Sequence, residues 1–258
     1  MENNIENKTN TSRIGITAST LSIIAMVTML IDHSGLVLFG NDMMMRIIGR
    51  IAFPIYGFML VEGYYKTSNK VKYFLKMMIL AILTEPIFDS LLLKSLCDFK
   101  HQNVLFELAF GIVLVHSVNK IRESTVNFST IKYIGYTLLL GSVMVASEIL
   151  NFDYGAIGLV MVLIFAIGYN TKLKWLTTIL GVVIPYVFLF KGNNVLGMIN
   201  ILGFELPIYL QTYAVLTIPF ILLYNGQKGI SNKTFKTFKY LFYPVHLLIL
   251  YLIIQIGG

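Results

Sequence analysis

Residues 15–38 read GITASTLSIIAMVTMLIDHSGLVL, an apolar run that is interrupted near its end by the adjacent pair Asp32 and His33. The run is long enough for a helix to cross a bilayer, which takes about 20 residues. Similar runs recur along the chain of 258 residues, of which 56% are hydrophobic and 13% are charged. Soluble domains carry roughly 25% charged residues, and membrane β-barrels show short alternating strands that are not evident in this sequence. The sequence therefore predicts an all-α polytopic membrane protein.

About nine segments are predicted to span the membrane, and together they form one integral membrane domain over residues 1–258. Residues 1–13 are polar and are expected to form a cytoplasmic tail. Residues 193–204 (NNVLGMINILGF) are too short to cross and are expected to be re-entrant or interfacial. If this segment pairs with a neighbour to cross, the bundle has ten helices. The predicted spans are 15–38, 44–64, 71–92, 103–119, 132–150, 154–170, 173–190, 207–225 and 239–256.

Basic residues are concentrated in alternate connections between these spans. Because cytoplasmic loops of membrane proteins collect Lys and Arg, the pattern predicts a protein of the bacterial cytoplasmic membrane whose N-terminus is inside, on the cytoplasmic side. With nine spans the C-terminus lies outside. The net charge of +7 is then a consequence of topology, and nucleic acid is not an expected partner. The basic connections carry Lys66, Lys70 and Lys72; Lys120, Arg122 and Lys132; Lys172 and Lys174; and Lys228, Lys233, Lys236 and Lys239.

Polar side chains from several predicted spans fall at a similar depth, toward the outer face. A charged residue at the centre of a membrane helix costs roughly 2.5–3.5 kcal/mol, so such residues usually face a partner or water. Two interpretations are open. One is an ion-pair network that fixes helix packing, with Arg50 bonded to Glu85 or Asp32; the other is a polar cavity that opens outward. The members of this outer cluster are Asp32, His33, Arg46, Arg50, Glu85, Asp89, Asn103, Glu107, Glu148, Asp153 and Tyr154.

A smaller inner cluster is predicted where Glu62 and Lys66 end the second span and residues 239–246 (KYLFYPVH) begin the last. Tyr243 and His246 are three residues apart and so share one helix face. Lysines and tyrosines around an inner opening suit a ligand that carries phosphate and adenine. The alternative is that they are interfacial anchors of the kind common on membrane helices. Four scattered histidines and one cysteine give no metal-ligand spacing, so no metal is expected.

Six segments, in this order over nearly the whole chain, resemble the TraX family: IIAMVTMLIDHSG (23–35), RIIGRIAFPIYGFMLVEGYYKT (46–67), LAILTEPIFD (80–89), QNVLFELAFG (102–111), DYGAIG (153–158) and KYLFYPVHLLIL (239–250). The Asp-His pair, the G-R-x-A-F-P block and the F-Y-P-x-H block are specific in combination. That family is known for N-terminal acetylation of conjugative pilin with acetyl-CoA, and it is distantly similar to membrane acyltransferases. The resemblance implies the transmembrane acyltransferase fold. Ser22 stands where the family commonly carries lysine, so no cation is expected there.

The reaction implied by the resemblance is acetyl transfer from acetyl-CoA to an amine or hydroxyl acceptor, such as a protein or peptide N-terminus. His33 is expected to act as general base or as a transient acetyl carrier. Arg50, ahead of Arg46, is expected to stabilise the oxyanion. Glu85 or Glu107 is the expected orienting partner of His33. The expected catalytic residues are His33, Asp32, Arg50 and Glu85.

Coenzyme A is expected to bind at the inner cluster, with its long arm reaching outward to His33. The residues expected to bind it are Arg46, Lys66, Tyr243 and His246, and those expected to bind the acceptor are Asp89, Asn103, Glu107, Asp153 and Tyr154. Membrane lipid is the other expected partner. The rival class is a transporter, because intramembrane His, Asp and Glu also form substrate sites and proton relays. The missing inverted-repeat pattern counts against it.

Overall fold

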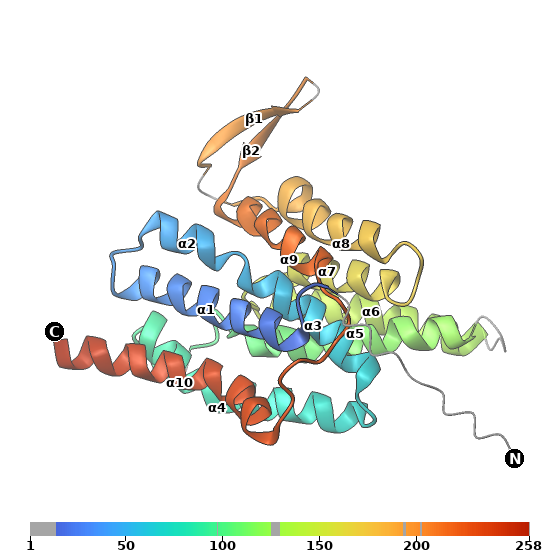
Figure 1. Ribbon diagram of the computed structural model, residues 1–258, viewed down its shortest axis with the longest axis horizontal. Helices are drawn as coiled ribbons and strands as arrows, with labels where there is room; N and C mark the ends of the chain where they lie inside the picture. Colours follow the sequence, from blue (N-terminus) through green and yellow to red (C-terminus); the bar gives the residue numbers. More distant parts are fainter. Residues whose placement is uncertain (1–13, 97, 125–129, 193–194, 202, 258) are drawn as a thin grey trace, which may run out of the picture.

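The computed structural model describes residues 14–96, 98–124, 130–192, 195–201 and 203–257, and the expected polar tail at 1–13 lies outside them. Helices build the described part of the chain, apart from one β-hairpin (Figure 1). The helices are α1 (Ala18–Val37), α2 (Met43–Gly49), α3 (Ala52–Lys66), α4 (Lys70–Leu92), α5 (Val104–Ser124), α6 (Thr130–Ile149), α7 (Gly155–Gly168), α8 (Lys174–Val183), α9 (Ile218–Leu222) and α10 (Lys233–Gly257). A π-helical turn at Ile184–Leu189 extends α8, and a 3₁₀ segment at Leu210–Thr217 precedes α9.

The second predicted span is broken into α2 and α3 at Arg50 and Ile51. Pro54 explains the break, because proline lacks the N–H that would otherwise donate to the carbonyl of Arg50. The backbone N–H of Arg50 turns to the carbonyl of Ile47 (3.1 Å). Helix α2 then runs beside the second half of α1 (Figure 1), which brings Arg46 of α2 and the following Arg50 to the face of α1 that carries Asp32.

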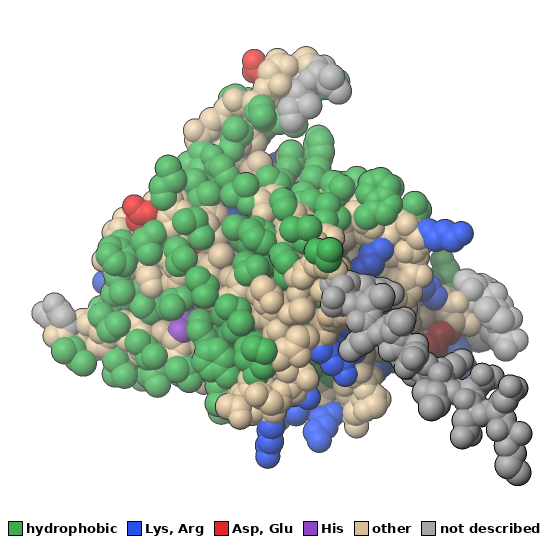
Figure 2. Space-filling model, viewed as in Figure 1, with side chains coloured by type: hydrophobic (Ala, Val, Ile, Leu, Met, Phe, Trp, Pro, Cys, Tyr) green, Lys and Arg blue, Asp and Glu red, His purple; other side chains and the backbone are tan. Residues whose placement is uncertain are grey.

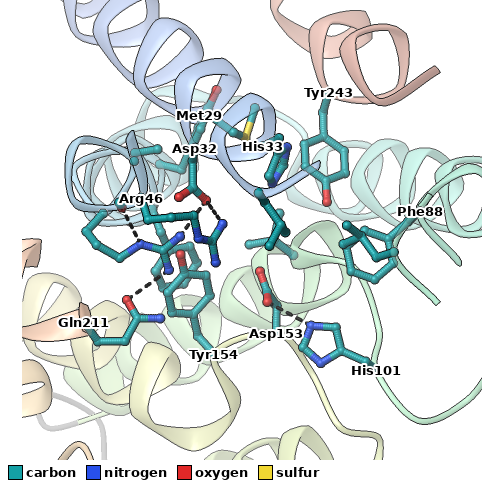
Figure 3. Close-up of a pocket in the computed structure, with 18 residues that line it drawn as sticks. Met29, Asp32, His33, Arg46, Phe88, His101, Asp153, Tyr154, Gln211 and Tyr243 are labelled. Atoms are coloured by element: carbon teal, nitrogen blue, oxygen red, sulfur yellow. Dashed lines mark hydrogen bonds and ion pairs between the residues drawn. The ribbon is translucent and has the colours of Figure 1, made fainter. Parts of the chain in front are cut away.

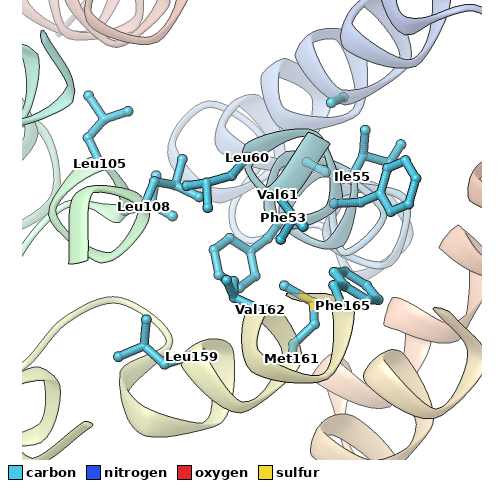
Figure 4. Close-up of a cluster of buried hydrophobic side chains, with 14 of the residues drawn as sticks. Phe53, Ile55, Leu60, Val61, Leu105, Leu108, Leu159, Met161, Val162 and Phe165 are labelled. Carbon is cyan, nitrogen blue, oxygen red and sulfur yellow. The ribbon is translucent and has the colours of Figure 1, made fainter. Parts of the chain in front are cut away.

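Helix α3 lies at the centre of the bundle, where it packs against α1, α5 and α7 (Figure 4). Ile55 and Val61 of α3 are at most 1% exposed and belong to one continuous cluster with Leu108 of α5 and Val162 of α7. Lipid tails are as apolar as these side chains, so van der Waals packing rather than exclusion of water holds such helices together. The packed centre therefore gives the polar side chains around it a rigid support.

The outward faces of α4, α6 and α10 are apolar, which indicates contact with lipid rather than with water. Figure 2 shows hydrophobic side chains over much of the visible face, with Lys and Arg gathered toward the end of the bundle where α4 and α10 begin. The exposed apolar residues include Leu75, Ile79 and Leu83 of α4, Ile134, Leu138 and Val145 of α6, and Leu241, Leu248 and Leu252 of α10.

Five helical segments of the described chain are long and apolar enough to cross a membrane, and they coincide with five of the predicted spans. They are Ala18–Val37, Met43–Lys66, Val104–Glu123, Thr130–Ile149 and Lys233–Ile256. The chain is thus an all-α, multi-pass membrane protein. Other apolar helices are shorter: the 14 residues of α7 rise roughly 21 Å, less than the roughly 30 Å of a hydrocarbon core. The total of nine to ten spans stays a prediction.

Residues 197–201 and 204–208 form a β-hairpin, and the expectation that residues 193–204 are re-entrant or interfacial stays a prediction. Strand β1 (Gly197–Ile201) pairs antiparallel with β2 (Phe204–Ile208), and the hairpin projects away from the helices (Figure 1). The predicted span 207–225 is wrong as a single helix, because it begins inside β2 and continues as the 3₁₀ segment and α9. Gly203, with φ of 89°, permits the turn between the strands, and Pro207 cannot join a helix interior.

Gly49 controls how closely α2 approaches α1, because a Cβ atom at this position would overlap the side chain of Asp32. We predict that Gly49→Ala destabilises the protein by about 1–3 kcal/mol, the usual cost of overpacking. The matched control is Gly141→Ala in α6, where nothing lies within 4 Å of an added Cβ. That change should be neutral or stabilising by up to about 1 kcal/mol. Thermal unfolding in one detergent measures both, and equal effects would contradict this packing.

Candidate functional site

A cavity of about 270 Å³ lies where α1, α2, the α4–α5 connection, the α6–α7 turn, the 3₁₀ segment and α10 meet (Figure 3). Much of the predicted outer cluster lines it, together with apolar side chains such as Met29, Phe53 and Phe88. Six residues of that predicted cluster therefore converge on one cavity: Asp32, His33, Arg46, Arg50, Asp153 and Tyr154. The polar side chains that line the cavity are Asp32, His33, Arg46, Arg50, Tyr56, His101, Asp153, Tyr154, Gln211 and Tyr243.

Asp32 binds both arginines of α2 and the turn that follows it. Its Oδ2 lies 2.5 Å from Nη2 of Arg50 and 2.9 Å from Nη1 of Arg46. The Arg50 side chain also donates from Nε to the carbonyl of Arg46 (3.2 Å) and from Nη1 to Oε1 of Gln211 (3.2 Å). All three of its nitrogens are thus engaged. Arg46 is freer, because its buried Nε has no partner among the described residues.

His33 pairs with His246 of α10 and not with a carboxylate. Nδ1 of His33 and Nε2 of His246 are 2.7 Å apart, and Tyr243 packs against the His33 ring. The predicted inner location of Tyr243 and His246 is therefore wrong. Helix α10 begins at Lys233, six residues before the predicted span, so both residues lie near its middle and meet the C-terminal half of α1, where His33 lies.

Four predicted site residues lie behind the cavity wall, where they hold the loops that carry the lining residues. The Asn103 N–H donates to Oε2 of Glu85 (3.2 Å), and the Tyr154 N–H donates to Oε2 of Glu107 (2.7 Å). Asp89 accepts in the same way from the N–H of Asp98 (2.7 Å). Glu85 and Glu107 are therefore bonded to loops, and the place of the expected orienting partner of His33 is taken by His246.

His101 and Gln211 line the cavity but were not predicted as site residues. Nε2 of His101 lies 3.0 Å from Oδ1 of Asp153, and this hydrogen bond raises the pKa of the imidazole above its usual value. The contact joins the α4–α5 connection to the α6–α7 turn, beside the bridge between Gln102 and Phe152. His101 could have been found from the sequence, because it lies two residues before Asn103 at the start of a predicted span. Nothing in the sequence marked Gln211 as a site residue.

Lys66 belongs to a separate cluster at the other end of α3. Its Nζ lies 2.5 Å from Oε1 of Glu62, and Tyr224 donates to the same oxygen (2.7 Å). Lys174, at the start of α8, lies 3.8 Å from Oε2 of Glu62 and over the rings of Phe58, Tyr169 and Tyr224. Lys66 therefore does not share a site with His246. In the described part of the chain no three His, Cys, Asp or Glu residues are placed to hold a metal ion.

The cavity combines an imidazole, a partly free guanidinium and apolar walls. A neutral imidazole accepts a proton, and a guanidinium donates to an oxygen on which negative charge develops. Apolar side chains such as Met29, Phe53 and Phe88 form part of the lining, and beside them these interactions are stronger than they are in open water. The arrangement is therefore suited to proton abstraction combined with stabilisation of an oxyanion.

Comparison with known proteins extends over most of the chain. The probable fimbrial assembly protein FimC, serogroup H1, of Dichelobacter nodosus is 24% identical over 253 residues, which cover 92% of this chain and 95% of that protein. An uncharacterised protein of Rickettsia prowazekii is 29% identical over 159 residues, or 57% of each chain. No solved structure matches. The family model for TraX protein matches residues 17–254, from the start of α1 almost to the end of α10, and the chain therefore belongs to the TraX family.

Proposed function

We propose that this protein is a membrane-embedded acyltransferase that moves an acetyl group from acetyl-CoA to an amine or hydroxyl acceptor. The observation that carries the proposal is the position of His33. Its Nδ1 is bonded to His246, and the ring lines the same cavity as Arg46 and Arg50. A base and an oxyanion donor around one cavity are the groups that acyl transfer needs.

His33 handles the proton in this reaction. Its Nε2 takes the proton of the acceptor as the acceptor nitrogen or oxygen bonds to the acetyl carbon. When the thioester C–S bond breaks, the same nitrogen returns the proton to the departing thiolate. One positioned base thus serves both halves of the reaction, a role that contributes typically about 10²- to 10⁴-fold to the rate.

Arg46 is the better candidate for the oxyanion donor, although Arg50 is the deeper residue. Arg50 is bonded at all three nitrogens and is 7% exposed. Arg46 uses Nη1 for Asp32, is 16% exposed and keeps Nε without a described partner. In this proposal Arg50 holds Asp32 and the bend after α2, while Arg46 donates to the thioester oxygen.

Acetyl-CoA supplies the activated acetyl group as a thioester. The cavity of about 270 Å³ is slightly smaller than typical ligand sites, which span roughly 300–1,000 Å³, so it suits the reacting groups and not the whole donor. Arg46 lines the cavity and its side chain is 16% exposed, so its guanidinium can donate to a carbonyl oxygen there. Basic residues at the far end of the bundle, among them Lys66 and Lys174, fit the phosphates. If that end faces the cytosol, the N-terminus of the chain lies on the cytoplasmic side of the bacterial cytoplasmic membrane.

The proposed acceptor is a protein or peptide N-terminus, and a fimbrial subunit is the first candidate. Support comes from the name of the Dichelobacter nodosus relative, a probable fimbrial assembly protein, which is similar along almost its whole length. Of the residues expected to bind the acceptor, Asp153 and Tyr154 line the cavity, and both lie in the α6–α7 turn.

We predict that His33→Ala lowers acetyl transfer by about 10²- to 10⁴-fold, the usual contribution of a positioned base. The purified protein in lipid nanodiscs is given acetyl-CoA labelled in the acetyl group and a host membrane extract, and free thiol and labelled product are followed. His116→Ala is the control, because His116 pairs with Tyr64 away from the cavity (2.8 Å). Movement of a solute without thiol release would favour the transporter class.

The two arginines should separate in their effects. We expect Arg46→Gln to lower the transfer rate about 10²- to 10³-fold, as loss of an oxyanion donor does, and to lower the unfolding temperature less than Arg50→Gln does. Arg50→Gln should destabilise the protein by about 3–5 kcal/mol, because it leaves Asp32 short of its closest partner. Thermal unfolding and the thiol assay on both variants test this division. The reverse pattern would assign the oxyanion role to Arg50.

A further inference from the structure

The pairing of His33 with His246 joins two histidines that are 213 residues apart in the chain. The rings are nearly parallel (5°) with centroids 5.0 Å apart, while the two nitrogens are only 2.7 Å apart. Rings that stack face to face cannot bring atoms closer than their van der Waals contact, roughly 3.5 Å. The rings therefore lie side by side, and the hydrogen bond runs along their planes.

The direction of this hydrogen bond follows from the other nitrogen of His246. Its Nδ1 lies 2.8 Å from the carbonyl oxygen of Phe242. A carbonyl only accepts, so Nδ1 of His246 carries the hydrogen. In a neutral imidazole the second nitrogen is then an acceptor, and Nε2 of His246 accepts from Nδ1–H of His33. The lone pair of His33 is thereby left on Nε2.

We infer that His246 is a positioning residue that holds His33 as its Nδ1–H tautomer and so makes Nε2 the proton-accepting atom. No described residue hydrogen-bonds to Nε2 of His33, and the ring lines the cavity. His246 is 4% exposed and does not line the cavity, so it acts on the reaction through His33 alone. This inference rests on the proposed role of His33 as the base.

Carboxylates usually orient a catalytic imidazole, but the nearby acids are engaged elsewhere. Asp32 binds the two arginines, and Glu85 and Glu107 bind loop N–H groups. A neutral imidazole sets the tautomer without adding a negative charge beside the base. It also stabilises a protonated His33 less than a carboxylate does, which favours prompt return of the proton to the leaving thiolate.

Helix α10 fixes the direction of the two successive hydrogen bonds, from His33 to His246 and from His246 to Phe242. The acceptor of the His246 hydrogen is the carbonyl four residues earlier on the same helix, so the helix itself sets the orientation of the ring. The Phe242 ring packs on His246 with centroids 5.0 Å apart, which limits rotation of the imidazole. Both features leave Nε2 of His246 aimed at α1.

The test compares His246→Phe with His246→Gln. Phe keeps an aromatic ring but removes the acceptor, whereas the amide oxygen of Gln replaces it. In serine hydrolases, loss of the partner that fixes the histidine tautomer lowers kcat by about 10⁴-fold. We expect His246→Phe to lower kcat by about 10- to 10⁴-fold with little effect on KM. We expect His246→Gln to recover most of the rate. Leu248→Phe, on the exposed face of α10, controls for ring insertion.

The tautomer is read separately by ¹⁵N NMR of histidine-labelled protein in nanodiscs, with His33 assigned by its loss in His33→Gln. We expect Nδ1–H in the wild type and in His246→Gln, and a larger share of Nε2–H in His246→Phe. An unchanged tautomer in His246→Phe would overturn the inference, even with a reduced rate. Because this readout needs no acetyl-CoA, it stays decisive if the wild type releases no thiol, a result that would count against the proposed function alone.

Discussion

The bond between the Asp32 carboxylate and two guanidiniums is the interaction on which the site depends. A carboxylate within a bilayer is costly unless it is paired, and Asp32 meets that demand with Arg46 and Arg50 at 2.9 and 2.5 Å. The pairing requires α2 to lie against α1, which Gly49 permits and the break before Pro54 allows. Since adjacent helix residues point about 100° apart, fixing Asp32 on one side of α1 also fixes where His33 points.

The same constraint explains the layer of acids behind the cavity. Backbone N–H groups near a membrane must be satisfied within the protein, and Glu85, Asp89 and Glu107 accept from the N–H groups of the connecting loops. These loops carry His101 and Asp153 into the cavity. The ion-pair network and the polar cavity, which the sequence left as alternatives, are thus two parts of one arrangement, because the network shapes the cavity.

Hydropathy and helical spacing predicted the membrane class, the long helices and the pairing of Arg50 with Asp32 as one of two options. Spacing within a helix shows which residues share a face, but it does not show how deeply one helix sits against another. His246 was therefore misplaced, because α10 begins at Lys233 and not near Lys239. Gln211 was missed because a 3₁₀ segment after a hairpin has no regular hydrophobic period to reveal it. Tertiary contacts decide such positions.

The roles of His33 and Arg46 are tested most directly by a structure of the protein in lipid nanodiscs with an acetyl-CoA analogue whose thioester is replaced by a non-transferable linkage. We expect the acetyl end to lie in the cavity, with its carbonyl oxygen within hydrogen-bond distance of Arg46 and its carbon beside the His33 ring. An acetyl end bound outside this cavity, or no binding at saturating analogue, would contradict the assignment of His33 and Arg46 as the groups that perform the transfer.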